Sequence, residues 1–134
     1  MVQLLIPYRL PKVQPNDDFV IPPSSNDYTD GDTVPQIPGL SVWMMSSHTH
    51  KRMTNFTVDN VQAGTPSRIY ENTDWHAPIQ KIFDPPFVGK SGDQLAWACT
   101  WNNETVSPIV FGPTTEDEMC IMVVTVFPAF DYSP

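Results

Sequence analysis

The sequence predicts an all-β fold, an antiparallel jelly-roll-like β-sandwich in a single domain, on two observations. Fifteen prolines and six glycines are spread over the 134 residues, and an interior proline breaks a helix because it removes a hydrogen bond and clashes with the preceding turn. Between these breaks lie short runs rich in aromatic, β-branched and methionine residues, which is the pattern of strands joined by turns. Long helices are therefore not expected.

The expected strands form seven runs, each bounded by Pro, Gly, Asn or Asp. They are 40–51, 53–62, 67–70, 79–83, 95–102, 107–111 and 118–127. We expect residues 1–39 to add edge strands and long loops, and residues 40–128 to form the core with the candidate metal motifs. Because no linker-sized polar run divides the sequence, residues 1–134 are expected to be one domain.

Side chains alternate between the two faces of a strand, so the residues of two predicted strands can be assigned to faces. In 40–51 both His48 and His50 fall on one face, and in 118–127 Met119 and Cys120 fall on opposite faces. The full sets are Val42, Met44, Ser46, His48 and His50 on one face of the first strand, and Cys120, Met122, Val124 and Val126 on one face of the second.

The charge balance argues against nucleic acid and anionic membranes as partners. The formal net charge is −8, with only seven Lys and Arg residues, whereas a phosphate-binding surface needs clustered cations. No run approaches the roughly 18 consecutive apolar residues of a membrane span. Residues 1–11 lack the basic start and long apolar run of a signal peptide, so if the protein is exported, its signal is not in this chain.

His48 and His50, in S-H-T-H-K-R, form the first candidate metal site. Two imidazoles on one strand face lie about 6 to 7 Å apart at the backbone and can converge on one ion. The alternative is that both are solvated side chains at a strand end. A third ligand would select the metal, since a carboxylate or His76 would favour zinc or non-haem iron, whereas a thioether would favour Cu(I).

Cys99 and Cys120 are the only cysteines, and such a pair can form a disulfide, stay as buried thiols or bind a metal. A blue-copper site would place a His and a Met shortly after one cysteine, and no His follows Cys120. This favours the disulfide, which would close a loop of about 20 residues and stabilise the fold by about 3 kcal/mol. Disulfides persist in oxidising compartments, so we expect an extracytoplasmic protein, periplasmic or secreted.

Three further features are expected to be structural. His76 has no histidine neighbour in a proline-bounded turn, and we expect it at the surface. The acidic run 116–118 is expected to form a solvated turn. Trp97 and Trp101 share a strand face with Cys99 and are expected to pack in the core.

Three motifs together resemble a known family: S-H-T-H-K, then A-C-T-W-N-N-E-T, then F-G-P-T-T-E-D-E-M-C. The combination is similar to the C-terminal domain of the copper type II, ascorbate-dependent monooxygenases. That family includes peptidylglycine α-hydroxylating monooxygenase and dopamine β-monooxygenase, and this chain resembles its bacterial, single-domain relatives. The resemblance covers residues 20–127 and is strongest from residue 40 onward. H-x-H alone is a weak signal, but H-x-H followed by a cysteine and then by D-E-M-C is specific.

The resemblance implies a jelly-roll-like sandwich that binds one copper ion, called CuM in the family, through His48, His50 and Met119. It also implies a disulfide between Cys99 and Cys120. In the family, dioxygen is activated at this copper, an unactivated C–H bond is hydroxylated, and ascorbate supplies the electrons. Two imidazoles and a thioether keep Cu(I) accessible and leave a position open for dioxygen. No catalytic residue beyond the metal ligands is assigned.

Two departures from the family pattern limit what the resemblance implies. Family enzymes have a second β-domain with a copper bound by three histidines, and apart from the two candidate ligands only His76 remains here. The peptidylglycine enzymes hold the substrate carboxylate with an Arg two residues before H-x-H and with polar residues just beyond E-M-C. Those positions here are Ser46, Ile121 and Val123. The substrate is therefore expected to be more apolar than a peptidylglycine, or absent.

Three functions follow as hypotheses. The first, which the resemblance favours, is a monooxygenase-like oxidoreductase that takes dioxygen and a small-molecule substrate, with electrons from ascorbate, another reductant, or a separate electron-donor domain or protein. The second is a copper-binding or copper-carrying module without turnover. The third is a structural or interaction β-sandwich.

Overall fold

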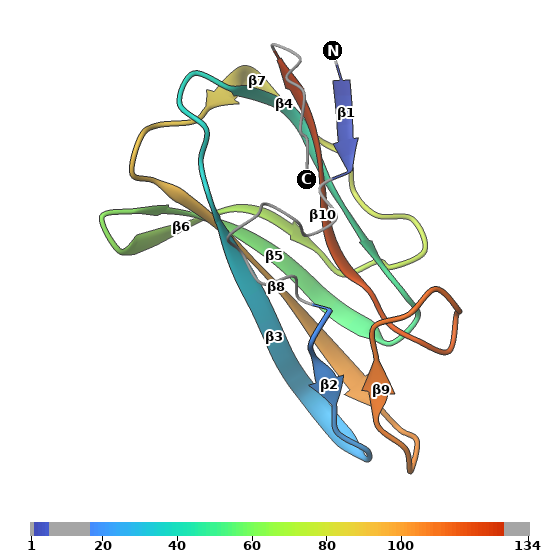
Figure 1. The fold of residues 1–134 in the computed structure, drawn as a ribbon. Helices are drawn as coiled ribbons and strands as arrows, with labels where there is room; N and C mark the ends of the chain where they lie inside the picture. The colour runs from blue at the N-terminus through green and yellow to red at the C-terminus, as the bar shows by residue number, and fades with distance from the viewer. Residues whose placement is uncertain (1, 6–16, 128–134) are drawn as a thin grey trace.

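Strands account for all the regular structure in the part of the chain that can be described. The structure is a computed structural model that describes residues 2–5 and 17–127 (Figure 1). Within these ranges there is no helix, and so none that is long and apolar enough to cross a membrane. The strands are β1 (Val2–Leu5), β2 (Val20–Ile21), β3 (Ser25–Pro35), β4 (Ser41–Thr49), β5 (Met53–Gln62), β6 (Thr65–Asn72), β7 (Lys81–Val88), β8 (Gln94–Asn103), β9 (Ile109–Val110) and β10 (Cys120–Phe127).

Two four-stranded sheets pack face to face as a sandwich (Figure 1). Sheet A has the order β1-β10-β4-β7, sheet C has the order β3-β8-β5-β6, and β2 and β9 form a separate two-stranded sheet B. Every pairing is antiparallel. From β3 to β8 the chain passes back and forth between sheets A and C, and it stays within one sheet only at the β5–β6 hairpin. This arrangement confirms the predicted all-β, antiparallel, jelly-roll-like sandwich.

The strand boundaries differ from the prediction at β7 and at β9. Strand β7 runs through Pro85 and Pro86 to Val88, whereas the predicted run stopped at residue 83. Proline cannot donate to a ladder, but β7 is the edge strand of sheet A, so the missing donors cost it little. The predicted run 107–111 contains only the two paired residues of β9.

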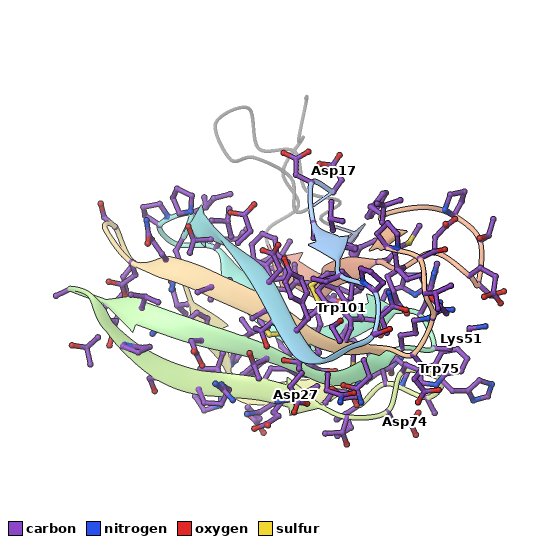
Figure 2. All side chains as sticks on the ribbon, turned by 90° about the horizontal axis from the view of Figure 1, so that it is seen from below. Asp17, Asp27, Lys51, Asp74, Trp75 and Trp101 are labelled. Atoms are coloured by element: carbon purple, nitrogen blue, oxygen red, sulfur yellow. A yellow bond between two sulfur atoms is a disulfide. The ribbon has the colours of Figure 1, made fainter. Side chains whose placement is uncertain are left out.

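The core between the sheets is built around the inner face of β8. Trp97, Cys99 and Trp101 alternate along this face and are 3%, 0% and 0% exposed, which confirms the predicted core placement of the two tryptophans. The Trp101 ring lies 4.6 Å from the ring of Phe19 and 6.4 Å from that of Tyr28, measured between centroids. Figure 2 shows Trp101 among the side chains between the sheets. Burial of such large aromatic surfaces is a main source of folding free energy.

A bulge at Trp43 corrects one predicted strand face. Val42 and Met44 pair with consecutive residues of β10, although Trp43 stands between them. One extra residue reverses the face that the following side chains take. Val42 therefore lies opposite Val126 on the core side and is buried, and the prediction that it shares a face with His48 is wrong.

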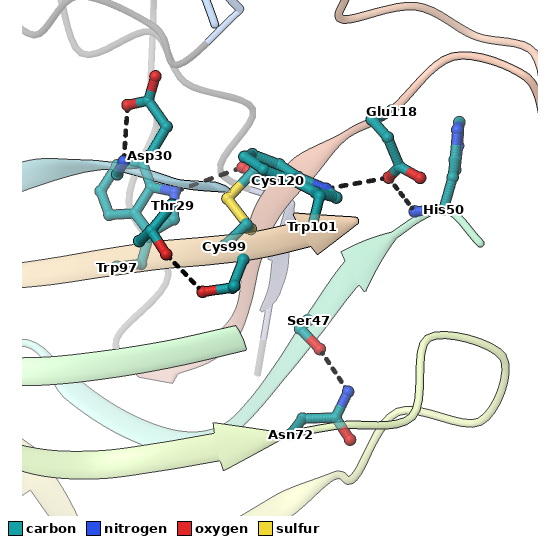
Figure 3. Close-up of a disulfide and its surroundings, with 12 residues drawn as sticks. Thr29, Asp30, Ser47, His50, Asn72, Trp97, Cys99, Trp101, Glu118 and Cys120 are labelled. Carbon is teal, nitrogen blue, oxygen red and sulfur yellow. Dashed lines mark hydrogen bonds between the residues drawn. A yellow bond between two sulfur atoms is a disulfide. The ribbon is translucent and has the colours of Figure 1, made fainter. Parts of the chain in front are cut away.

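The two cysteines form a disulfide that joins the two sheets (Figure 3). Cys99 belongs to β8 of sheet C, and Cys120 is the first residue of β10 in sheet A. Their Cα atoms are 5.9 Å apart, and both residues are fully buried. The Trp97 indole N–H donates a hydrogen bond to the Cys120 carbonyl at 3.3 Å. Of the three roles that the sequence allowed for this pair, the structure shows the disulfide.

The β5–β6 hairpin turns at the end of β5 that is farther from the 50–52 turn. Only Ala63 and Gly64 separate the two strands, and their φ angles are 48° and 80°. Two successive positive φ angles define the type I′ turn, whose twist matches that of the flanking strands. Both residues are exposed.

We expect loss of the Cys99–Cys120 disulfide to destabilise the protein by about 3 kcal/mol, because the cross-link restricts the unfolded chain across a sequence separation of 21. Urea unfolding of the wild type and of the Cys99→Ala, Cys120→Ala double variant measures the difference. As a control, the double variant should give the same value with and without a reductant. A loss below about 1 kcal/mol would contradict the expectation.

Candidate metal centre

His48 and His50 lie together at the end of β4. His48 is the last residue but one of the strand, and His50 follows the strand directly. Their ring centroids are 5.5 Å apart and the ring planes meet at 88°. One nitrogen from each ring can therefore approach the same ion.

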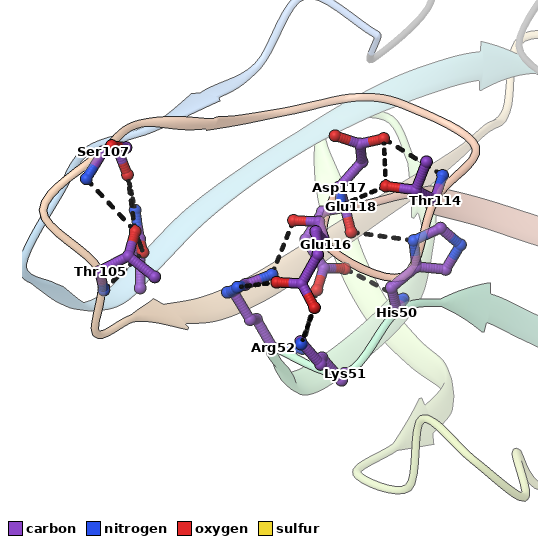
Figure 4. Close-up of polar contacts among 10 residues, drawn as sticks. His50, Lys51, Arg52, Thr105, Ser107, Thr114, Glu116, Asp117 and Glu118 are labelled. Carbon is purple, nitrogen blue, oxygen red and sulfur yellow. Dashed lines mark hydrogen bonds and ion pairs between the residues drawn. The ribbon is translucent and has the colours of Figure 1, made fainter.

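A hydrogen bond fixes which nitrogen of His50 is free to bind a metal (Figure 4). Its Nδ1 lies 2.9 Å from the backbone carbonyl oxygen of Asp117. A carbonyl oxygen only accepts, so Nδ1 carries the hydrogen and donates it. In the neutral ring Nε2 then keeps its lone pair, which is the arrangement found for metal-binding histidines whose other nitrogen is held by a second group.

The surroundings of His48 favour its neutral form. Partial burial lowers the pKa of the His48 imidazole, and the neighbouring His50 lowers it further. A metal ligand must be unprotonated. The neutral state that the fold favours is therefore the state that binds a metal.

Met119 directly precedes β10, the strand that pairs with the histidine-bearing end of β4. His48 pairs with Ile121 of β10, and Thr49 pairs with Cys120. Residues that pair across two strands share a face, and side chains alternate along each strand. Cys120 belongs to the core face. Met119 precedes β10 and is partly buried against the core cluster; the alternation of β10, if it continued to Met119, would put this residue on the face that carries His48.

Glu118 is buried, which corrects the prediction that the whole acidic run is solvated. Its side chain is 0% exposed, whereas that of Glu116 is 69% exposed. Burial raises the pKa of the Glu118 carboxyl, and hydrogen bonds from the backbone of Arg52 and His50 partly offset this rise. The burial of Glu118 could have been predicted from strand alternation, because Glu118 is two residues before Cys120 and therefore shares its face, which is the core face.

Both oxygens of the Glu118 carboxylate accept hydrogen bonds, and Figure 3 shows the two that Oε2 accepts. Oε2 accepts from the backbone N–H of His50 at 3.0 Å and from the indole N–H of Trp101 at 3.2 Å. Oε1 accepts from the backbone N–H of Arg52 at 2.7 Å. The Glu118 carboxylate therefore holds the 50–52 turn, which contains the candidate ligand His50. Glu118 is also the residue directly before the candidate ligand Met119.

On the solvent side, Glu116 forms a second set of polar contacts with the 50–52 turn (Figure 4). The Arg52 guanidinium donates to the Glu116 carbonyl at 2.8 Å and to its carboxylate at 3.1 Å. Lys51 forms an ion pair with the same carboxylate. The two cations next to the histidine pair are therefore both engaged by Glu116.

The third histidine does not join the pair. His76 is exposed in the loop between β6 and β7, with its ring centroid 5.4 Å from that of Trp75. Across residues 2–5 and 17–127 no three or more His, Cys, Asp or Glu side chains gather in a way that could hold a metal ion. The third ligand that the resemblance implies, the thioether of Met119, is not among those residue types and stays a prediction.

The positions next to the candidate ligands are uncharged. Ser46 pairs with Val123, two residues along each strand from the pairing of His48 with Ile121. All three of these neighbours of His48 are buried: Ser46, Ile121 and Val123. These are the positions where the peptidylglycine enzymes, by the resemblance, have Arg and polar residues.

The fold is an all-β sandwich with two neighbouring histidine rings at the end of β4. Residues 13–133 match the family described as copper type II ascorbate-dependent monooxygenase, C-terminal domain. The chain belongs to this family. A comparison with curated proteins found no match.

Ser47 and Thr49 are two hydroxyl residues on the core face of β4, and each is 3% exposed. The Ser47 hydroxyl accepts from the Asn72 amide at 3.1 Å and lies 3.3 Å from the Tyr70 hydroxyl. The Thr49 hydroxyl, which lies between the two histidines in sequence, is buried with no hydrogen-bond partner. A buried hydroxyl without a partner costs free energy.

We expect Ser47→Ala to destabilise the protein by about 1 to 3 kcal/mol, because it leaves one N–H of the buried Asn72 amide without an acceptor, while the other still donates to the Asp74 carbonyl at 2.8 Å. Thr49→Val should be neutral or stabilise by up to about 1 kcal/mol, because it removes an unpaired polar group. Urea unfolding of both variants tests the pair. Equal losses in the two variants would contradict the assignment of Thr49 as unpaired.

Proposed function

We propose that the protein binds one copper ion through His48, His50 and Met119 and acts as an oxygen-activating, monooxygenase-like oxidoreductase. The observation that carries the proposal is the hydrogen bond from His50 Nδ1 to the Asp117 carbonyl. It orients the His50 ring with Nε2 free, beside His48. The alternation of β10, continued one residue before Cys120, would put Met119 on the same face. Membership of the family supports copper as the metal.

The donor set suits copper in both oxidation states. Imidazoles bind Cu(I) and Cu(II), and a thioether favours Cu(I). Bound copper would supply the one-electron chemistry that reduces dioxygen and prepares it for insertion into a C–H bond. The protein's own part is to keep both imidazoles neutral, to hold His50 by its second nitrogen, and to present the thioether on the same face.

The surroundings of the proposed site favour an uncharged substrate. Ile121 and Val123 continue the ligand-bearing face along β10, and the nearby cations Lys51 and Arg52 are already paired with Glu116. A substrate carboxylate at this site would therefore compete with Glu116 for Lys51 and Arg52. We infer a small substrate that places an apolar C–H bond at the copper.

Electrons must reach the proposed site from outside the described chain. Two of the three histidines belong to the proposed site, and His76 does not gather with other His, Cys, Asp or Glu side chains in the described region. The proposed electron source is ascorbate or another small reductant, or a separate donor domain or protein. The buried disulfide supports an extracytoplasmic location, where such bonds persist.

We expect Met119→Leu to weaken Cu(I) binding about tenfold or more, or by about 1.4 kcal/mol, and to weaken Cu(II) binding much less. The change keeps the side-chain volume while it removes the thioether. Competition titrations with chromogenic Cu(I) and Cu(II) chelators measure both affinities.

His48→Ala serves as the comparison in the same titrations, because loss of an imidazole should weaken both oxidation states. Equal copper uptake by the wild type and by a His48→Ala, His50→Ala double variant would remove this site from consideration.

With copper and ascorbate, the wild type should consume dioxygen above a free-copper control, and the rate should rise with a small apolar substrate. An oxygen electrode measures the uptake, and the His48→Ala, His50→Ala variant is the matched blank. Tight copper binding without extra oxygen uptake would instead support a copper carrier, an alternative that the solvent-accessible position of His48 favours. Such a carrier should also exchange its copper readily with a chelator.

A further inference from the structure

We propose that Glu118 is a positioning residue whose carboxylate sets where His50 lies relative to Met119 and thereby sets the affinity for Cu(I). The inference rests on the proposed copper site and deepens it, because it gives a role to a residue outside the ligand set. Glu118 itself points to the core side, away from the face that carries the ligands.

The contacts of His50 converge on the two residues before Met119. Its backbone N–H donates to Glu118 Oε2 at 3.0 Å, and its ring Nδ1 donates to the Asp117 carbonyl at 2.9 Å. One short segment therefore holds both the backbone and the ring of this histidine. Because Met119 follows Glu118 in the chain, the placement of His50 and the placement of the thioether are coupled.

Only a carboxylate fits the hydrogen bonds at this position. The donors are the backbone N–H groups of His50 and Arg52 and the indole N–H of Trp101. A carboxylate offers two oxygens that only accept, whereas an amide of the same shape would turn an NH₂ group toward one of these donors. An apolar side chain would avoid the cost of burying a charge, but it could not hold the 50–52 turn.

The carboxylate is also anchored in the buried core, close to the disulfide. Trp101 is fully buried and lies two residues after Cys99, while Glu118 lies two residues before Cys120. The indole, the carboxylate and the disulfide thus connect sheet C to the start of β10 behind the proposed ligands (Figure 3). Removal of a group that hydrogen-bonds to a metal ligand commonly lowers the metal affinity by about 10- to 100-fold.

The first test needs no metal. Nitrogen-15 NMR of the copper-free wild type should show His50 as a single Nδ1–H tautomer, because of its bond to Asp117. In Glu118→Gln, which keeps the side-chain shape, the His50 ring should populate both tautomers. An unchanged His50 ring in this variant would overturn the proposal.

The second test measures copper. Glu118→Gln should bind Cu(I) about 10- to 100-fold more weakly than the wild type in chelator competition, and X-ray absorption should show a weaker Cu–S contribution. Val58→Ala, a core change in the middle of β5, is the control for lost stability and should keep the wild-type affinity and Cu–S signal. Equal affinity of Glu118→Gln and the wild type, or an equal loss in Val58→Ala, would overturn the proposal.

The two tests separate this inference from the proposed function. A wild type that binds no copper would refute the proposed copper site, while the NMR comparison would still decide whether Glu118 positions His50. Should Glu118→Gln fail to fold, Trp101→Phe removes one donor and leaves the carboxylate in place. It should shift the His50 tautomers in the same direction but less, and an unchanged ring would again count against the role of the carboxylate.

Discussion

The buried carboxylate of Glu118 continues the connection between β4 and β10 at the point where their backbone ladder stops. The last rung of that ladder pairs Thr49 with Cys120. Beyond it, β4 leads into the 50–52 turn and no longer lies in the sheet, so its N–H groups need other acceptors. The two oxygens of Glu118 take this place. The Glu118 side chain thereby accepts the hydrogen bonds that a further backbone pair would have accepted. It also holds the backbone of His50 at the end of β4.

The alternation of β10 separates stability from chemistry along one segment. Glu118, Cys120 and Met122 face the core, where they contribute a hydrogen-bonded anchor, a cross-link and packing. Ile121 belongs to the other face, opposite His48, and Met119 is proposed to share that face. A change to Cys120 or Met122 should therefore affect folding first, and a change to Met119 the proposed site, whereas Glu118 is proposed to affect both. The disulfide and the buried tryptophans of β8 hold the core side in place, and the ligand-bearing side depends on that rigidity.

The sequence predicted the fold through two strong signals, the frequency of proline and glycine and the alternation within the runs between them. It also placed Trp97 and Trp101 in the core. The bulge at Trp43 could not be predicted, since no glycine or proline marks it and the extra residue is defined only by the pairing with β10. The continuation of β7 through Pro85 and Pro86 depended on its edge position, which is a property of the whole sheet.

The candidate site shows the same division between local and distant causes. The closeness of the His48 and His50 rings follows from strand period alone. The burial of Glu118 and the orientation of the His50 ring do not, because their hydrogen-bond partners are far away in sequence, at separations of 66 to 68 residues for the 50–52 turn. Strand alternation puts Glu118 on the same face as the buried Cys120. An acidic run is nevertheless expected to be solvated unless the groups that donate hydrogen bonds to its carboxylates are known.

The hairpin turn at Ala63 and Gly64 makes the molecule suitable for attachment to a surface. The turn is exposed and compact, and the whole of β5 separates it from the 50–52 turn beside the histidines. Loop tips of this kind commonly accept inserted residues. A short linker placed there would tether the protein to an electrode or a bead with the histidine pair turned toward the bulk solution, so that electron exchange could be followed on oriented molecules.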